Sequence, residues 1–99
     1  MKSRVFFLDY SQEPDSLPGI EALCRESGIL KAISRGDSVG VKVHMGELGN
    51  VTYIRPALVR KVVELAKKRG GRPFVTDTVT LYPGARDTAK KYLSTAAYN

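Results

Sequence analysis

Short apolar segments alternate along this chain with longer segments of helical periodicity, and this alternation restricts the possible folds more than any other feature of the sequence. Residues 5–10, 39–45 and 73–78 have the apolar composition of strands. Strands that alternate with helices are connected by right-handed crossovers, which place the strands parallel in one sheet. The sequence therefore predicts an α/β fold, a three-layer, Rossmann-like open parallel sheet of about three strands with crossover helices.

A helix is predicted after each of these strands, and the chain carries start and stop signals for them. The first helix covers residues 20–24 and ends at Gly28, with Ser16 or Asp15 as its candidate cap. The second begins at Pro56, which suits the first turn of a helix, and runs through Lys68 to a pair of glycines. The third opens at residues 84–87, and the residues expected to face the sheet are Ala85, Thr88, Ala89, Tyr92 and Leu93.

A sheet of so few parallel strands is thin, and a parallel sheet needs cover on both of its faces. The 99 residues also stop at Asn99 without a terminating glycine or a charged tail. We therefore expect residues 1–99 to form a single α/β domain that is the N-terminal fragment of a longer protein.

Composition excludes several classes of protein. No apolar run approaches the roughly 18 residues that a transmembrane helix needs, and Asp9 ends the first apolar run too early for a signal peptide. A cytoplasmic location is expected, with no membrane partner. Cys24 is the only cysteine, so the chain can form neither an internal disulfide nor a thiolate metal cluster, and its expected role is that of a packed thiol.

The net charge of +6 raises the question of nucleic acid binding. The basic residues cluster on the polar faces of the predicted helices, and no set of aromatic side chains interleaves with them to stack on bases. Nucleic acid is therefore not expected as a partner. Solvated helix faces are the favoured interpretation, and a phosphate-contacting or partner-docking surface is left open.

Two basic side chains on one predicted strand mark a candidate site. Lys42 and His44 are two residues apart, so on a strand they point the same way, about 6.5–7 Å apart. A buried parallel strand is normally apolar on both faces, so this pair needs an explanation. Lysine supplies a compact charge for phosphate or carboxylate, and histidine supplies a proton-transfer group or a metal-binding nitrogen. We interpret the pair as part of a polar site at the strand's C-terminal end.

Open parallel sheets bind ligands at the C-terminal ends of their strands, where two of the predicted strands deliver polar residues. Gly46 and Gly49 permit tight turns and would leave backbone amides open to an anion. The candidate catalytic residues are His44, Asp77 and Glu47, and the candidate ligand-binding residues are Lys42, Gly46, Gly49, Asn50, Arg55, Thr78 and Tyr82. Histidine occurs once in the chain, so a two-histidine metal site is excluded and no set of metal ligands is assigned.

Structural roles compete with functional ones for most of these residues. Lys42 could form a salt bridge with Asp77 or Glu47, and His44 could be a strand-end histidine bonded to a neighbour or a metal ligand. The competing structural roles elsewhere are a turn at Asn50, a surface ion pair at Arg55, strand propensity at Thr78 and packing over the sheet edge at Tyr82. No phosphate loop, dinucleotide fingerprint, CxxC, HExxH or nucleophile elbow is present to decide among them.

Three blocks of the sequence resemble a known family. They are K-x-H-x-G-E-x-G-N from Lys42 to Asn50, Ile54-Arg55-Pro56, and Thr76-Asp77-Thr78 with Leu81 and Tyr82. Residues 36 to about 98 are similar to the N-terminal domain of a family of uncharacterised iron–sulfur centre proteins of bacteria and archaea. The resemblance implies a ferredoxin-like segment with 4Fe–4S clusters. Its cysteine motifs are absent from this chain, so no cofactor is expected within residues 1–99, and the clusters would belong to a missing C-terminal segment.

The residues and the resemblance together favour the N-terminal α/β portion of an iron–sulfur protein that is redox-linked and has a redox partner. Lys42, His44 and Arg55 would hold an anionic small molecule, with Asp77 and Glu47 available for proton transfer or metal binding. Two further hypotheses drop catalysis: a module that binds an anionic metabolite or phosphate unchanged, and a protein-interaction module. The sequence does not decide between an enzyme and a binding module, and it does not give the oligomeric state.

Overall fold

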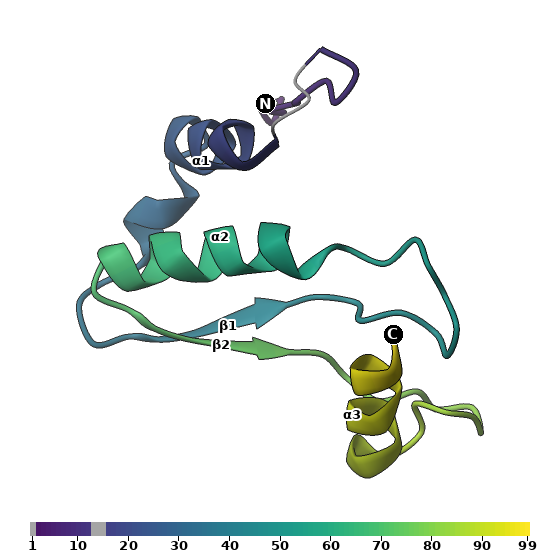
Figure 1. Cartoon of the computed structure of the whole chain (residues 1–99). Helices are drawn as coiled ribbons and strands as arrows, with labels where there is room; N and C mark the ends of the chain where they lie inside the picture. The colour runs from purple at the N-terminus through teal and green to yellow at the C-terminus, as the bar shows by residue number, and fades with distance from the viewer. Residues whose placement is uncertain (1, 13–15) are drawn as a thin grey trace.

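A computed structural model describes residues 2–12 and 16–99 and confirms the α/β class (Figure 1). In chain order its elements are α1 (Ser16–Glu26), the 3-10 helix η1 (Ile29–Ala32), β1 (Ser38–Lys42), α2 (Pro56–Lys68), β2 (Arg72–Thr76) and α3 (Ala89–Tyr98). The predicted start of α2 at Pro56 and its end at Lys68 are confirmed. Of the two candidate caps of the first helix, Ser16 is the first helical residue of α1, and Asp15 lies outside the described residues.

The sheet consists of β1 and β2, which run parallel with α2 as the crossover between them. Val39 lies opposite Pro73 and Lys42 lies opposite Thr76. Both strands end before their predicted limits, so His44 and Asp77 lie in the loops that leave the sheet. The ladder extends one bond beyond β1, where the Val43 N–H donates to the Thr76 carbonyl at 3.0 Å.

Pro73 occupies the outer edge of this sheet. The Arg72 N–H donates to the Asp37 carbonyl at 2.7 Å, and the Thr76 carbonyl accepts from Val43, so both residues direct their backbone groups toward β1. Since alternate residues of a strand direct these groups to opposite sides, Pro73 directs its own away from β1. Proline is tolerated there because no donor is missing from the ladder.

The predicted first strand at residues 5–10 is wrong. Residues 2–9 have no regular secondary structure, and the side chains of Val5 and Phe7 are 88% and 83% exposed. Leu8 contacts α1 at Gly19, and in Figure 1 this segment lies apart from both strands. A strand needs the backbone of a neighbour as well as an apolar pattern. Here α1 and η1 separate the segment from β1, and it follows α1 instead of the sheet.

The helices are distributed unevenly around the sheet. α2 packs against both strands, and α1 packs against α2, so that in Figure 1 α1 lies farther from the sheet than α2 does. The other face of the sheet carries Phe74, which is 51% exposed. Among the described residues the buried apolar side chains are Leu65 and Ala66 of α2 and Tyr92 of α3.

The third helix departs from its prediction in start and position. α3 begins at Ala89 instead of residues 84–87, and the Thr88 hydroxyl caps it by accepting the Lys91 N–H at 3.3 Å. The Thr80 N–H donates to the Arg86 carbonyl, so residues 80–86 form a closed loop before the helix. In Figure 1 α3 lies at the C-terminal ends of the strands instead of covering the sheet. Tyr92 is buried as predicted for an inward-facing residue, whereas Leu93 is 68% exposed and does not face the sheet.

Candidate functional site

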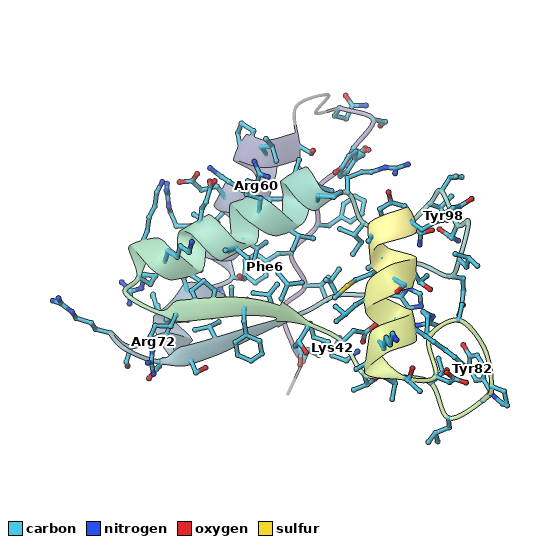
Figure 2. The ribbon with its side chains drawn as sticks, turned by 60° about the horizontal axis from the view of Figure 1, so that its bottom comes forward. Phe6, Lys42, Arg60, Arg72, Tyr82 and Tyr98 are labelled. Carbon is cyan, nitrogen blue, oxygen red and sulfur yellow. The ribbon has the colours of Figure 1, made fainter. Side chains whose placement is uncertain are left out.

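Asp77 is the centre of a hydrogen-bond network at the ends of both strands. Its side chain is 6% exposed and forms a salt bridge with the Lys42 ammonium at 3.0 Å. The Tyr92 hydroxyl donates to the second carboxylate oxygen. The same hydroxyl accepts the Met45 N–H at 3.1 Å. One tyrosine of α3 therefore connects the loop after β1 to the loop after β2, and Figure 2 shows Lys42 beside the start of this helix.

These contacts determine the charge state of Asp77. Burial by itself would raise the pKa of the carboxyl group, because a charged group loses hydration when it leaves water. The hydrogen bonds from Tyr92, Lys42 and the Thr78 N–H, together with the charge of Lys42, outweigh burial and lower the pKa from its ordinary value of 3.8 to about 2. Asp77 is therefore an ionised, fully engaged carboxylate at neutral pH, and the predicted Lys42–Asp77 salt bridge is confirmed.

A second ion pair lies beside the first. Arg86 is 6% exposed, and its guanidinium donates to the Glu47 carboxylate and to the Tyr82 hydroxyl. Tyr82 in turn donates to Glu47 at 3.0 Å. The hydrogen bond from Arg86 is the main reason that the pKa of Glu47 is lowered, and the bond to Glu47 is the main reason that the pKa of Arg86 is raised. Arg86 also lies 5.2 Å from the centre of the Tyr92 ring, so the two pairs are adjacent.

The loop at residues 46–50 has the predicted backbone but not the predicted open amides. Gly46 and Gly49 have φ values of 91° and 79°, which only glycine adopts easily. The Gly46 N–H donates to His44 Nδ1 at 3.0 Å, and the Gly49 N–H donates to the Asn99 side chain at 3.0 Å. Both amides are therefore already bonded, and the expectation that they stay open to an anion is wrong. The Asn99 amide also donates to the carbonyls of Met45 and Glu47.

Three other candidate residues make local contacts. The Asn50 side chain accepts the Thr52 N–H at 2.8 Å, which is the turn-forming role that competed with ligand binding. The Arg55 guanidinium donates to the Val51 carbonyl and lies 4.8 Å from the centre of the Tyr53 ring. The Thr78 N–H donates to Asp77 at 2.8 Å. The structure therefore brings Lys42, Glu47, Asp77, Thr78 and Tyr82 into two neighbouring ion-pair networks, and it places Arg55 outside them.

His44 lines a cavity of about 410 Å³ on the α2 side of the strand ends. Apolar side chains form most of its wall, and the polar side chains in it are those of His44, Tyr53 and Arg60. Because His44 Nδ1 accepts the Gly46 N–H, the proton of the neutral ring is assigned to Nε2. A smaller cavity of about 230 Å³ shares His44 and Tyr53 with the first. The two cavities place His44, unlike Glu47, beside space that a small molecule can enter. Asp77 lines a separate cavity of about 190 Å³ on the α3 side of the strand ends.

A known family covers all of these residues. The domain of unknown function DUF362 matches residues 39–99, which is more than half of the chain. The chain belongs to this family. The match runs from β1 through α3, so both ion-pair networks and the cavity beside His44 lie within the DUF362 segment. No curated protein and no solved structure matches the chain.

Sequence reasoning missed several residues of the DUF362 site. Arg86 carried no signal of burial, because a lone arginine before a predicted helix is normally solvated. Asn99 is 50 residues from the glycine that it contacts, so no local pattern connects them. Arg60 could have been identified, because it lies four residues after Pro56 on the turn of α2 that follows the strand-end loop.

The described residues of DUF362 contain no cluster of metal-ligating side chains. No group of three or more histidine, cysteine, aspartate or glutamate side chains is arranged to hold a metal ion in residues 2–12 and 16–99. In the same part of the chain, no helix has the length and apolar character needed to cross a membrane.

Proposed function

We propose that this DUF362 protein is a binding module for a small anionic molecule with an apolar body, held between α2 and the segment that follows β1. The observation that carries the proposal is the 410 Å³ cavity: the described residues of its apolar wall include two basic ones, His44 and Arg60, and no acidic one. Small-molecule sites typically have volumes of roughly 300–1,000 Å³, apolar walls and a few polar groups that orient the ligand.

The basic residues of the cavity differ from those of the strand ends. Lys42 and Arg86 already have carboxylate partners in Asp77 and Glu47. Arg60 is exposed and has no carboxylate within salt-bridge distance among residues 2–12 and 16–99. A guanidinium without an internal carboxylate partner can form a bidentate contact with a ligand carboxylate or phosphate.

His44 supports the same ligand chemistry. Its Nδ1 is bonded to the Gly46 N–H, so the neutral ring has its remaining N–H at Nε2, which can donate to an anion without a change of protonation. Binding therefore needs no proton transfer. Roles of His44, Asp77 and Glu47 in catalysis stay predictions. The engagement of both carboxylates within the protein favours binding over proton transfer.

The test uses chemical-shift perturbation and calorimetry with hexanoate, benzoate and inorganic phosphate as probes. We expect the two carboxylates to shift the signals of His44, Val59 and Val63, and phosphate, which has no apolar body, to bind more weakly. The Arg60→Gln variant should weaken carboxylate binding by about threefold to tenfold, because it removes one charge-assisted contact at an exposed site. Lys67→Gln removes the same charge from α2 outside the cavity and is the matched control. Equal affinities in the two variants, or shifts elsewhere, contradict the proposal.

The redox-linked part of the proposal rests on the resemblance to iron–sulfur centre proteins. A cubane cluster needs four thiolate ligands, and Cys24 is the only cysteine, so residues 1–99 do not fit such a cluster. We propose that any 4Fe–4S cluster belongs to a segment outside residues 1–99, and that the protein acts with a redox partner in the cytoplasm. A longer natural protein containing residues 1–99 should show broad visible absorption and bound iron after anaerobic purification. An iron-free, colourless product contradicts this part and leaves the cavity unaffected.

A further inference from the structure

Another cavity lies at the opposite end of α2 from the cavities beside His44, and it has a different chemistry. It measures about 330 Å³ and is formed by residues of α1, η1 and the last turn of α2. The C-terminal end of α2 is on the left in Figure 1. We call it the basic groove and define it by its cations Arg25, Lys31, Lys68 and Arg69 and its apolar residues Leu30 and Leu65. The strand-end cavity is lined by residues 56–63 of α2, so the two sites share no residue.

The carboxylates near the basic groove do not neutralise all of its positive charges. Glu21 is the one acidic residue among the described residues that line it, and its carboxylate is bonded by Arg25 at 2.8 Å and by Lys61 at 2.5 Å. Lys31 and Lys68 are exposed and have no carboxylate within salt-bridge distance among the described residues. The cations of the groove therefore exceed its acids, on a chain that already has a net charge of +6.

The groove also has a fixed shape and an apolar floor. The Arg69 Nε–H donates to the Leu30 carbonyl at 3.1 Å, which holds the guanidinium across η1 and leaves its other N–H groups available. Leu65, 4% exposed, lies beneath the charged rim. Cations around an apolar floor complement a segment that has both carboxylates and aliphatic side chains.

We propose that the basic groove binds an acidic segment of a partner protein, one in which carboxylates alternate with aliphatic residues. The carboxylates contact Lys31, Lys68 and Arg69, and an aliphatic side chain packs on Leu30 and Leu65. Nucleic acid fits less well, because none of the described residues that line the groove is an aromatic residue that could stack on a base. The net positive charge of the chain also accelerates the approach of an acidic partner.

Fluorescence anisotropy with two labelled peptides of equal charge tests the apolar part of the proposal. One peptide repeats Glu-Glu-Leu and the other repeats Glu-Glu-Gly. We expect tighter binding of the leucine peptide at low salt, and weaker binding of both as ionic strength rises, because exposed charges are screened. A labelled DNA duplex that binds as well as the leucine peptide overturns the proposal, as does equal affinity for the two peptides.

Charge-reversal variants locate the binding surface. Lys31→Glu and Lys68→Glu should each weaken binding of the leucine peptide by about threefold to tenfold, because each exchanges an attraction for a repulsion. Lys90→Glu changes the net charge equally on α3, outside the groove, and is the control. Equal weakening by all three variants shows a general charge effect and overturns the proposal. Circular dichroism of each variant checks that the fold is retained.

Discussion

The Tyr92 hydroxyl is expected to contribute a large share of the stability of the strand-end site, and Tyr92→Phe removes it with little change in shape. The hydroxyl donates to the ionised carboxylate of Asp77 and accepts the Met45 N–H. A hydrogen bond to a charged group contributes about 1.5–3 kcal/mol. We therefore expect Tyr92→Phe to lower the free energy of unfolding by about 2–3 kcal/mol at pH 7.

The pH dependence of this loss follows from the pKa of Asp77. Folding lowers that pKa from 3.8 to about 2. A carboxyl group with a lowered pKa stabilises the folded state above its unfolded-state pKa, and the contribution is lost as pH falls through the folded-state value. At 1.36 kcal/mol per pH unit, this contribution amounts to about 2 kcal/mol above pH 4 and disappears toward pH 2 and below. The difference between wild type and Tyr92→Phe should shrink over the same interval.

Urea denaturation followed by circular dichroism at pH 7, 4, 3 and 2 measures both effects. Other carboxyl groups also titrate in this interval, but their contributions cancel in the difference between the two proteins. Tyr98→Phe, on the exposed side of the same helix, should leave the free energy of unfolding unchanged within about 0.5 kcal/mol. If the loss caused by Tyr92→Phe is the same at pH 2 as at pH 7, the hydroxyl is not coupled to ionised Asp77 and the argument is refuted.

Three further substitutions test the loops around this network. Gly46→Ala should lower the free energy of unfolding, measured by urea denaturation, by more than about 1 kcal/mol, because the φ of Gly46 is 91° and the new Cβ would lie 2.8 Å from the Asn99 amide nitrogen. Gly49 also has a positive φ, but a Cβ there would meet no atom within 4 Å, so Gly49→Ala should lower the free energy of unfolding by less. Lys42→Met should raise the pKa of Asp77, measured from the pH titration of its carboxyl carbon by NMR, and an unchanged pKa would show that Lys42 does not act on it. Thr88→Ala should lower the free energy of unfolding by about 1 kcal/mol through loss of the α3 cap, and an unchanged denaturation midpoint would contradict the capping role.

Local signals predict the central part of the fold. α2 is predictable from three signals: Pro56 at its start, an apolar periodicity along its length and a glycine pair after its end. Each of these signals involves only residues that are close together in the sequence. The first segment is not predictable in this way. Residues 5–10 have a strand composition, but pairing depends on whether a neighbouring backbone is free beside them, and the path of α1 and η1 leads them away from the sheet.

In the candidate site, too, some features are predictable from the sequence and others depend on tertiary contacts. The Lys42–Asp77 pair is foreseeable from the sequence, because parallel strands with this register bring the residues after their ends together. The glycine conformations in the loop are foreseeable as well. The bonding of that loop's amides is not, because Asn99 reaches it from the end of α3. The burial of Arg86 likewise depends on the packing of Tyr92 and on the position of Glu47, which are tertiary features.

Pro73 limits how the sheet of this protein can be extended. An added strand must exchange backbone hydrogen bonds with an exposed edge, and on the outer side of β2 the proline supplies no donor. Stacking of copies through that edge, the route by which exposed strands begin to aggregate, is therefore hindered. The free side of β1 has no proline between Ser38 and Lys42. A further strand would therefore pair with the free edge of β1. β1 would then become a central strand, and β2 would remain an edge strand.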